Sequence, residues 1–314
     1  MTGDQARRLL ALSREARWTF PSSSGNPIGK NAGEWAGRLI AEQAAFAEAA
    51  RVLTGEGNAD AAMEIAANVW RLWIHSRTIA AGRAFLAPIL GNAAKGPSRS
   101  RALALYGDGL LAFWQGARED SRARNEAALA AAREVGDPEA LALASLGLSR
   151  VALSDRNHER ARTLAVEARE LARELSPAMG QAPLHMHAQA LWLAGDYDGA
   201  ARLFAESLEL NRRLADHGMV VVELHNLGHV EVHRGNIDEA ERLFTECAQS
   251  GSADDPYSKA MLEVNTACVG WGRGDAERAR SLLHSAESLL AKAGIDPAAE
   301  DQTELRWLRD QLAR

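Results

Sequence analysis

The sequence has 314 residues, of which 46% are hydrophobic and 25% charged, and its formal net charge is −6. This composition is typical of a globular protein, and the negative charge gives no general attraction to nucleic acid or to anionic membranes. No apolar run approaches the roughly 20 residues of a membrane span, and two cysteines form neither a disulfide framework nor a metal cluster. We therefore expect a cytoplasmic protein that binds neither nucleic acid nor a membrane.

The N-terminal 32 residues are expected to form a capping helix followed by a loop. Residues 4–18 place leucines and a tryptophan among arginines, which predicts an amphipathic helix. We interpret this helix as a cap, because the edges of stacked helical units need covering; a helix that docks a partner is the alternative. Residues 19–32 are a loop by composition. The GNPIGK segment within it lacks the glycine spacing and the Ser or Thr of a phosphate-binding loop, so we expect no nucleotide site there.

Helices are expected next at residues 33–54, 58–76 and 78–92. The last two belong to a degenerate first unit at about 58–97. In this unit Gly82 keeps a small position that recurs later in the chain, whereas Trp70 and Ile89 occupy two other such positions. Trp70 and Trp73 are expected to close the end of the core.

Five regular units follow from about 98 to 293, each a pair of helices. The pairs are expected at 98–115/117–135, 137–154/156–175, 178–194/196–214, 217–234/236–250 and 256–273/275–293. Three positions in each unit carry a small residue, and equivalent positions are 39 or 40 residues apart. They are Gly109, Ser149, Ala188, Gly228 and Ala267; Ser121, Ala161, Ala200, Ala240 and Ala279; and Ala128, Ala168, Ser207, Cys247 and Ala286. Small residues let helices approach closely, and one two-helix unit buries its apolar face only by stacking on the next.

The turns between the helices carry matching signals. Within three units the turn is Gly195–Asp196, Gly235–Asn236 or Gly274–Asp275. Glycine ends one helix in the left-handed conformation, and Asp or Asn caps the next helix. Turns between units contain Asp137–Pro138, Ser176–Pro177 and Asp255–Pro256, and proline suits the first position of a helix. A last helix at 297–313 is expected to seal the final unit with Leu305, Trp307, Leu308 and Leu312.

The small-residue offsets resemble those of the tetratricopeptide repeat (TPR), although the period exceeds the usual length of about 34 residues. The stretch Glu34–Trp35…Arg38–Leu39…Glu42 resembles the entry helix of the C-terminal TPR sensor region in large ATP-dependent bacterial transcription regulators of the maltotriose-responsive type. The resemblance covers roughly 33–292. It implies an all-α, TPR-like helical-hairpin solenoid wound as a right-handed superhelix, with about 14–15 helices and a capping helix at each end.

The expected domain organisation is a cap and loop at 1–32, the solenoid at 33–293 and a capping helix at 294–314. The regulators that the chain resembles also carry an ATPase module and a DNA-binding domain. About 32 residues before the sensor-like region and about 20 after it leave no room for either. We therefore expect a stand-alone sensor module, or a scaffold that serves another task.

The first helices of TPR units line a concave groove, so the TPR offsets also predict a binding surface. The expected ligand-binding residues are Tyr106, Phe113, Trp114, Arg150, His185, Gln189, Trp192, His225, His229, His233 and Trp271. A mostly apolar concave surface with a few polar anchors is typical of ligand sites. The polar members can fix an anionic or hydroxylated group, and the aromatic members can stack on a ring. The alternative is that the aromatic residues are core shared between adjacent units.

Metal binding and catalysis are not expected. His225, His229 and His233 share one helical face, but the outer two lie about 12 Å apart along a helix that rises about 1.5 Å per residue, too far for one ion. Cys268 can meet a histidine of the neighbouring unit as a Cys/His pair, although a buried cysteine is more often a packing residue. We expect no cofactor and no metal.

The sequence thus predicts a non-enzymatic, ligand-binding regulatory TPR protein of a bacterial cytoplasm that holds a small molecule or short peptide in its groove. A protein–protein interaction scaffold is the first alternative. An enzyme of a natural-product pathway on a TPR scaffold is the second.

Overall fold

The computed structural model describes residues 1–19, 32–92, 96–251 and 255–314, and the predicted loop with its GNPIGK segment lies mostly outside these residues. Every regular element in the described residues is an α-helix, from α1 to α17, which confirms the all-α fold. The helices form two compact units, Met1–Met186 and His187–Arg314, with the boundary inside α11.

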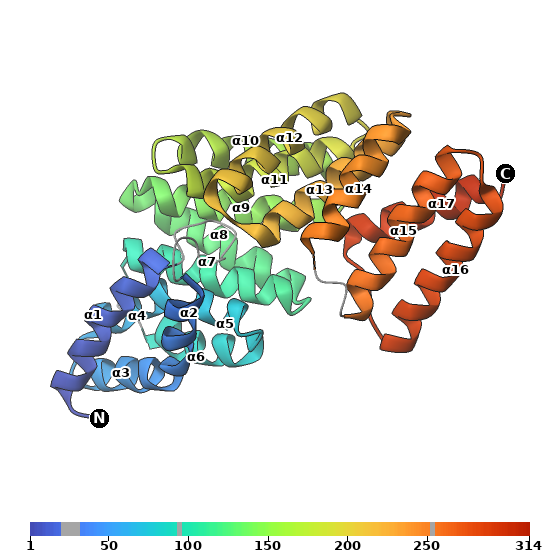
Figure 1. Ribbon diagram of the computed structural model, residues 1–314. Coiled ribbons are helices and arrows are strands. Elements are labelled where there is room, and N and C mark those ends of the chain that lie inside the picture. Colours follow the sequence, from blue (N-terminus) through green and yellow to red (C-terminus); the bar gives the residue numbers. More distant parts are fainter. Residues whose placement is uncertain (20–31, 93–95, 252–254) are drawn as a thin grey trace. The chain divides into compact units, whose positions relative to one another are not determined.

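The described part of the first unit begins with six helices (Figure 1). They are α1 (Gly3–Thr19), α2 (Ala32–Ala41), α3 (Gln43–Gly55), α4 (Ala59–Val69), α5 (Arg71–His75) and α6 (Ile79–Asn92). The segments 33–54 and 58–76 are therefore two helices each, not one. At both breaks the backbone forms a hydrogen bond between residues three apart, as in a 3₁₀-helix. These bonds run from Glu42 N to Leu39 O and from Trp73 N to Trp70 O. These breaks raise the number of helices above the predicted 14–15.

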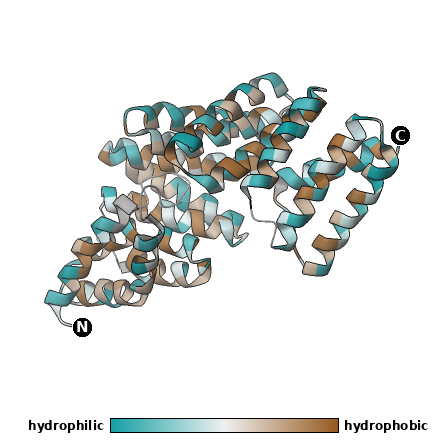
Figure 2. Ribbon diagram, in the orientation of Figure 1, coloured by the Kyte–Doolittle hydropathy of each residue, from teal (hydrophilic) through white to brown (hydrophobic). Residues whose placement is uncertain are grey.

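The regular helix pairs lie where the repeats predict them (Figure 1). In the first unit they are α7 (Arg99–Trp114) with α8 (Arg118–Val135) and α9 (Pro138–Ser154) with α10 (His158–Arg173), followed by α11 (Pro177–Leu193). In the second unit α12 (Tyr197–Leu214) packs on α13 (His217–His233), which pairs with α14 (Ile237–Ser250), and α15 (Pro256–Gly272) pairs with α16 (Ala276–Ala293). Figure 2 shows hydrophobic and hydrophilic residues on the same helices, as stacking amphipathic helices require.

The small residues sit where helices come closest. Ser149 Oγ of α9 donates a hydrogen bond to the carbonyl of Ala161 in α10 over 2.8 Å, so these two small positions meet directly. A Cβ atom on Gly228 would lie 2.3 Å from Cε1 of Phe244, a distance that real contacts do not allow. The prediction that these positions need small residues for close packing is confirmed at both sites.

The turns within the units share one left-handed residue. It is Gly116, Gly195, Gly235 or Gly274 in four units, with φ between 78° and 85°. Arg77 and Arg156 take the equivalent place in two other units with φ of 56° and 60°. Because a side chain destabilises this conformation by about 1–2 kcal/mol, both arginines are strained. Asp196 caps α12 by accepting from Gly199 N over 2.9 Å, as predicted.

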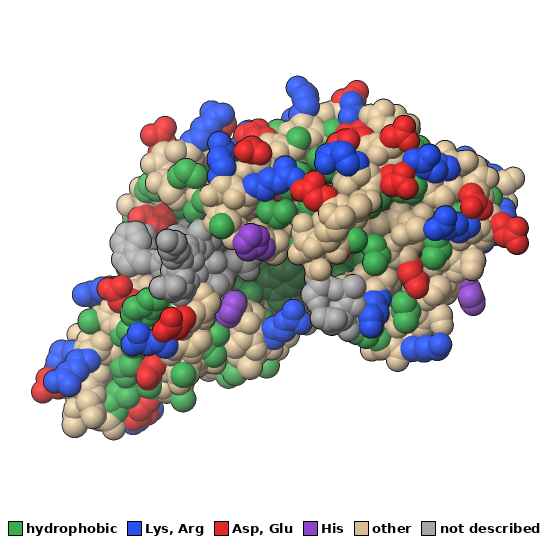
Figure 3. All heavy atoms as spheres, viewed as in Figure 1, with side chains coloured by type: hydrophobic (Ala, Val, Ile, Leu, Met, Phe, Trp, Pro, Cys, Tyr) green, Lys and Arg blue, Asp and Glu red, His purple; other side chains and the backbone are tan. Residues whose placement is uncertain are grey.

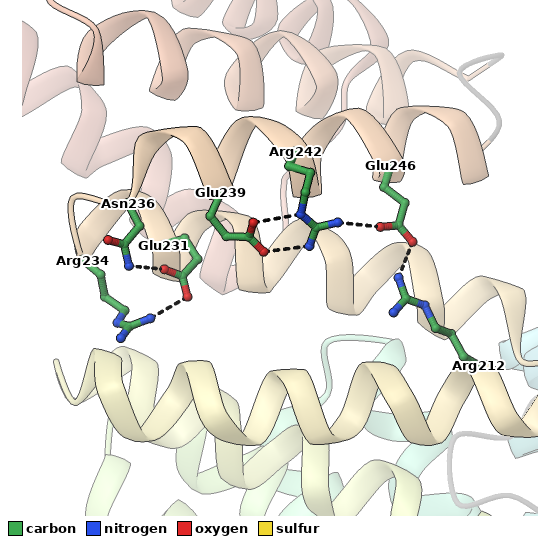
Figure 4. A network of polar contacts seen from close by, with 7 residues as sticks. All are labelled: Arg212, Glu231, Arg234, Asn236, Glu239, Arg242 and Glu246. Atoms are coloured by element: carbon green, nitrogen blue, oxygen red, sulfur yellow. Dashed lines mark hydrogen bonds and ion pairs between the residues drawn. The ribbon is translucent and has the colours of Figure 1, made fainter.

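One predicted cap works differently. Asn236 makes no side-chain cap to its helix. Its amide instead donates to Glu231 over 2.6 Å within the polar network of Figure 4. The same network joins Arg234 to Glu231, and Arg242 to Glu239 and Glu246, along the outside of α13 and α14. The Arg242 pairs are exposed and contribute little to stability, whereas Glu231 is buried with Arg234 and Asn236 as its partners.

The last helix, α17 (Ala299–Leu312), lies at the C-terminal end of the second unit. Leu305, Leu308 and Leu312 are buried in one cluster with Leu283 and Leu290 of α16. They therefore seal the final hairpin, as the sequence predicts. None of the helices in the described residues is long and apolar enough to cross a membrane.

Candidate functional site

A cluster of histidines and carboxylates lies between α13 and α17 in the second unit. His225, His229 and His233 follow one another at four-residue intervals, so they share one face of α13, which we call the histidine face. Asp301 and Glu304 are one turn apart on α17 and lie against this face. His225 Nε2 is 3.0 Å from Asp301 Oδ1, and His233 Nε2 is 2.9 Å from Glu304 Oε1. The histidine face is therefore covered by the chain's own last helix.

Glu304 is the centre of the cluster. Its side chain is 2% exposed, and its second oxygen, Oε2, lies 3.0 Å from His233 Nε2 and 3.4 Å from His229 Nδ1. Burial alone would raise the pKa of this carboxyl, but hydrogen bonds from His229 and His233 lower it to about 2. Glu304 is thus an ionised, buried carboxylate whose charge is compensated by imidazole donors.

His225 and Asp301 form the second pair. Burial works against the charged imidazole, but the hydrogen bond to Asp301 and the nearby carboxylates raise the pKa of His225. The pKa of Asp301 is lowered, chiefly by His225 against the effect of burial, and the hydroxyl of Tyr257 on α15 also donates to this carboxylate. Burial and the neighbouring His225 lower the pKa of His229. The charged form is therefore favoured at His225 and the neutral form at His229.

Aromatic rings enclose the outer end of the cluster. The ring of His233 stacks on Tyr197 with centroids 4.6 Å apart and an interplanar angle of 3°. Trp307 of α17 covers His233 with its centroid 4.4 Å away, and it packs edge-on against Trp271 at 4.9 Å. The contact of α17 with the histidine face is therefore both polar and aromatic.

The cluster is poorly suited to catalysis or metal binding. Cys268 Sγ lies 3.9 Å from His229 Nδ1, the same ring nitrogen that faces Glu304. Burial raises the pKa of the Cys268 thiol well above its usual value, so a nucleophilic thiolate is disfavoured. Among the described residues, no group of three or more His, Cys, Asp and Glu side chains is placed to hold a metal ion.

The predicted ligand-binding residues of α7 and α9 lie in the first unit. Tyr106 is fully buried, packs edge-on against Trp70 and accepts a hydrogen bond from Arg150 Nη1 over 3.1 Å. Phe113 is partly exposed and meets Trp114 edge-on at 5.7 Å. Trp114 is 60% exposed, the largest value among the exposed large hydrophobic residues of the described chain. This end of α7 is therefore open, whereas its middle is core.

The predicted residues of α11 are mostly enclosed. His185 is partly exposed, but Gln189 and Trp192 are buried. The Trp192 ring packs edge-on against Phe204 of α12 at 6.0 Å and lies parallel to His229 at 6.3 Å. Trp192 therefore packs against the ring of His229 and has almost no exposed surface that a ligand could contact.

Sequence reasoning did not identify Asp301, Glu304, Tyr197 and Tyr257 as partners of the histidines. One signal was present in the segment 299–312. Asp301 and Glu304 lie on the same side of this helix as Leu305, Leu308 and Leu312, because all five are buried. Acidic residues within an apolar stripe indicate that they have cationic or donor partners in the fold.

Two surface pockets lie in the described residues, and Tyr197 lines one of them. A pocket of about 270 Å³ lies among α8, α9 and α10, and one of about 410 Å³ lies at the helix turns beside Tyr197 and Arg234. None of the predicted ligand-binding residues lines either pocket. Figure 3 shows acidic and basic side chains intermixed over α10 in the first unit and over α12 and α14 in the second, as is typical of a solvated surface.

Comparison with known proteins identifies the repeat. The tetratricopeptide repeat model matches residues 181–250, and no curated protein has a significantly similar sequence.

Three solved structures are similar over much of the chain. A Rap protein complexed with competence and sporulation factor has 14% identity and a TM-score of 0.59, covering 98% of this chain and 99% of that one. NprR in complex with its cognate peptide NprX has 18% identity and a TM-score of 0.56, covering 78% and 70%. The APC/C hetero-tetramer Cut9–Hcn1 has 13% identity and a TM-score of 0.61, covering 98% and 53%. The chain therefore has the tetratricopeptide-repeat fold, and residues 181–250 carry the sequence signature of the repeat.

Proposed function

We propose that this is a non-enzymatic TPR protein of a bacterial cytoplasm. It binds a peptide segment of a protein partner on a surface formed by the first helix of a helix pair. One observation carries the proposal. The histidine face of α13 already holds a helix, α17, through two carboxylates and Trp307. A surface that accommodates a 14-residue helix of its own chain has the size and chemistry of a peptide site.

Two further points favour a peptide and a regulatory role. The Rap and NprR structures that share the fold are complexes with competence and sporulation factor and with the peptide NprX. The entry stretch at 34–42 resembles the sensor region of large transcription regulators. In the first unit, the exposed Trp114 beside Phe113 supplies an open aromatic anchor of the kind that peptide-binding surfaces use.

A small-molecule ligand is the second candidate, and the same exposed pair favours it. Phe113 and Trp114 meet edge-on, so their open faces can stack on an aromatic compound. The two candidates differ in the mass of the bound species. Native mass spectrometry after incubation with a cytoplasmic extract of the host bacterium separates them, and tandem sequencing identifies a released peptide.

The test uses a matched pair of tryptophan variants. We expect a peptide or protein adduct whose synthetic binding segment has at least tenfold weaker affinity for Trp114→Ala when it binds the first unit, or for His233→Gln when it binds the second unit. Trp35→Ala is the control, because Trp35 is also exposed, at 38%, and lies on α2 outside the predicted surface. An adduct of a few hundred daltons would replace the peptide with a small molecule. Equal affinity in all variants would refute the proposed faces.

A further inference from the structure

The buried face of α17 carries both apolar and acidic residues, and sealing the fold explains only the apolar ones. Leu305, Leu308 and Leu312 are buried with the leucines of α16. Asp301 and Glu304 lie on the same face and are 5% and 1% exposed. Burying carboxylates is costly unless specific donors receive them, and apolar residues would close the same surface more cheaply. Sealing the hairpin therefore does not explain these two carboxylates.

The contacts define a register along the two helices. Asp301 meets His225, Glu304 meets both His229 and His233, and the next residue one turn on, Trp307, covers His233 and Trp271. Each step of three residues on α17 corresponds to about one turn of α13, so the helices match turn by turn. The pattern is an acid, a second acid three residues later and an aromatic residue three residues after that.

The connection between α16 and α17 allows exchange of the helix. It consists of residues 294–298, and Gly294 has φ of 64°, a conformation that ends α16 without requiring α17 to continue it. At the far end Arg280 holds α17 by donating to the carbonyl of Leu312 over 2.9 Å. The two ends of α17 are thus held by a short connection and by one backbone contact, and its buried leucines hold it to α16 along its length.

We propose that α17 is a resident, displaceable occupant of the histidine face, and that the partner which this face recognises is an acidic amphipathic helix of another protein. This inference rests on the proposed function and specifies its partner. The partner helix carries two carboxylates and an aromatic residue in the register of Asp301, Glu304 and Trp307. It also carries leucines in the register of Leu305, Leu308 and Leu312, because the apolar surface of α16 must be covered again.

Charge favours this occupant. The histidine face offers imidazole donors, one of them in an environment that favours the charged form. The segment Ala299–Leu312 has four acidic and two basic residues, so it is a net anionic helix. A basic or neutral helix in the same place would leave the buried donors of α13 without acceptors. The intact chain suppresses binding in trans, because a short tether gives α17 an effective concentration in the millimolar range.

The experiment measures binding of a fluorescent peptide to the full-length chain by anisotropy. The probe is the sequence of residues 297–314, with a second peptide that has Asn and Gln in place of Asp301 and Glu304. The protein carries Asp301→Asn and Glu304→Gln together, which weakens resident α17 but keeps its leucines. Asp310→Asn is the control, because Asp310 is an exposed carboxylate on the same helix. Circular dichroism confirms that each variant is folded.

We expect the acidic peptide to bind the double variant at least tenfold more tightly than the wild-type chain or Asp310→Asn. The amide peptide should bind at least tenfold more weakly than the acidic one. Adding His225→Gln and His233→Gln to the double variant should abolish the difference between the peptides. Leu308→Ala is the second way to loosen α17, and it must give the same order of affinities.

The outcomes separate this inference from the proposed function. Equal affinity for the acidic and amide peptides would show that the two carboxylates are not required, and it would leave the proposed peptide binding intact. Equal affinity for wild type and both loosened variants would overturn displacement, because the resident helix would then not compete. If neither peptide binds a chain whose α17 has opened, as hydrogen exchange over 299–312 reports, this inference and the assignment of the histidine face both fail.

Discussion

Replacement of Glu304 by Gln tests the role of the carboxylate that holds α17 on the histidine face. Glutamine has nearly the same shape and retains one acceptor oxygen, but it removes the charge and puts a donor where His233 or His229 donates. The carboxylate faces both ring nitrogens at 2.9–3.4 Å. The substitution therefore removes charge-assisted hydrogen bonds without creating a cavity.

The magnitude follows from the pKa of the carboxyl. Its fall from 4.5 to about 2 corresponds to roughly 3 kcal/mol of stabilisation of the ionised group in the folded protein. This contribution is present above pH 4.5 and is lost as the pH falls toward 2. Since the amide retains part of the hydrogen bonding, we expect the variant to lose about 2 kcal/mol at neutral pH. The loss falls on the contact of α17 with α13, so local opening of α17 becomes roughly 30-fold more frequent.

Hydrogen exchange measured by mass spectrometry reports this opening directly. Amides of α17 should exchange roughly 30-fold faster in Glu304→Gln, whereas those of α7 and α9 in the first unit should keep the wild-type rate. Asp310→Asn provides the control for loss of a negative charge on the same helix. The reasoning is refuted if protection of α17 changes no more in Glu304→Gln than in Asp310→Asn.

Three further predictions concern the same helix and the repeats. The raised pKa of His225 stabilises the docked helix below pH 6.5, and this contribution is lost as the pH rises through the pKa of the folded state. Hydrogen exchange of α17, corrected for the intrinsic exchange rate, should therefore become faster between pH 6 and pH 9. The His225→Gln variant should not show this pH dependence. Arg156→Gly should raise the free energy of unfolding by up to about 1 kcal/mol in denaturant titrations, because it relieves the left-handed arginine. Gly228→Ala should lower the free energy of unfolding by about 1–3 kcal/mol, because the added methyl group clashes with Phe244. Gly180→Ala is the matched variant, because nothing lies within 4 Å of its added methyl group. It should raise the free energy of unfolding by about 0.5–1 kcal/mol in the same titrations.

The regular helices could be predicted because each repeat states the same packing requirement. Close approach of helices allows only small side chains at positions such as Ala200 and Ala240, both fully buried, and the requirement returns every 39 or 40 residues. The breaks near Glu42 and Trp70 were not predictable in this way. Both occur before the regular units, and at the second break the large Trp70 fills the place of a small residue.

The binding surface was only partly predictable. Helical periodicity places His225, His229 and His233 on one face, and the structure has them together. The side chains that cover this face come from α17, and the local sequence does not predict where α17 packs. Glu304 contacts His233, which lies more than seventy positions earlier in the chain. Gln189 and Trp192 lie at sequence offsets that are typical of groove residues and were therefore predicted to bind a ligand. Both side chains are buried in the second unit.

One buried acceptor beside α17 bears on the competition between this helix and a partner helix. His229 is buried with a lowered pKa, so its neutral ring directs its one proton from Nδ1 toward Glu304 and leaves Nε2 as an acceptor. No hydrogen-bond partner for Nε2 exists among the described residues. An incoming helix that supplies a donor there would gain about 1–3 kcal/mol, or roughly 5- to 150-fold in affinity. That gain offsets part of the advantage that the tether gives α17, and ligands that lack the donor forgo it. The unfilled nitrogen thus narrows the advantage of the resident helix over a partner that carries the acidic register together with this one extra group.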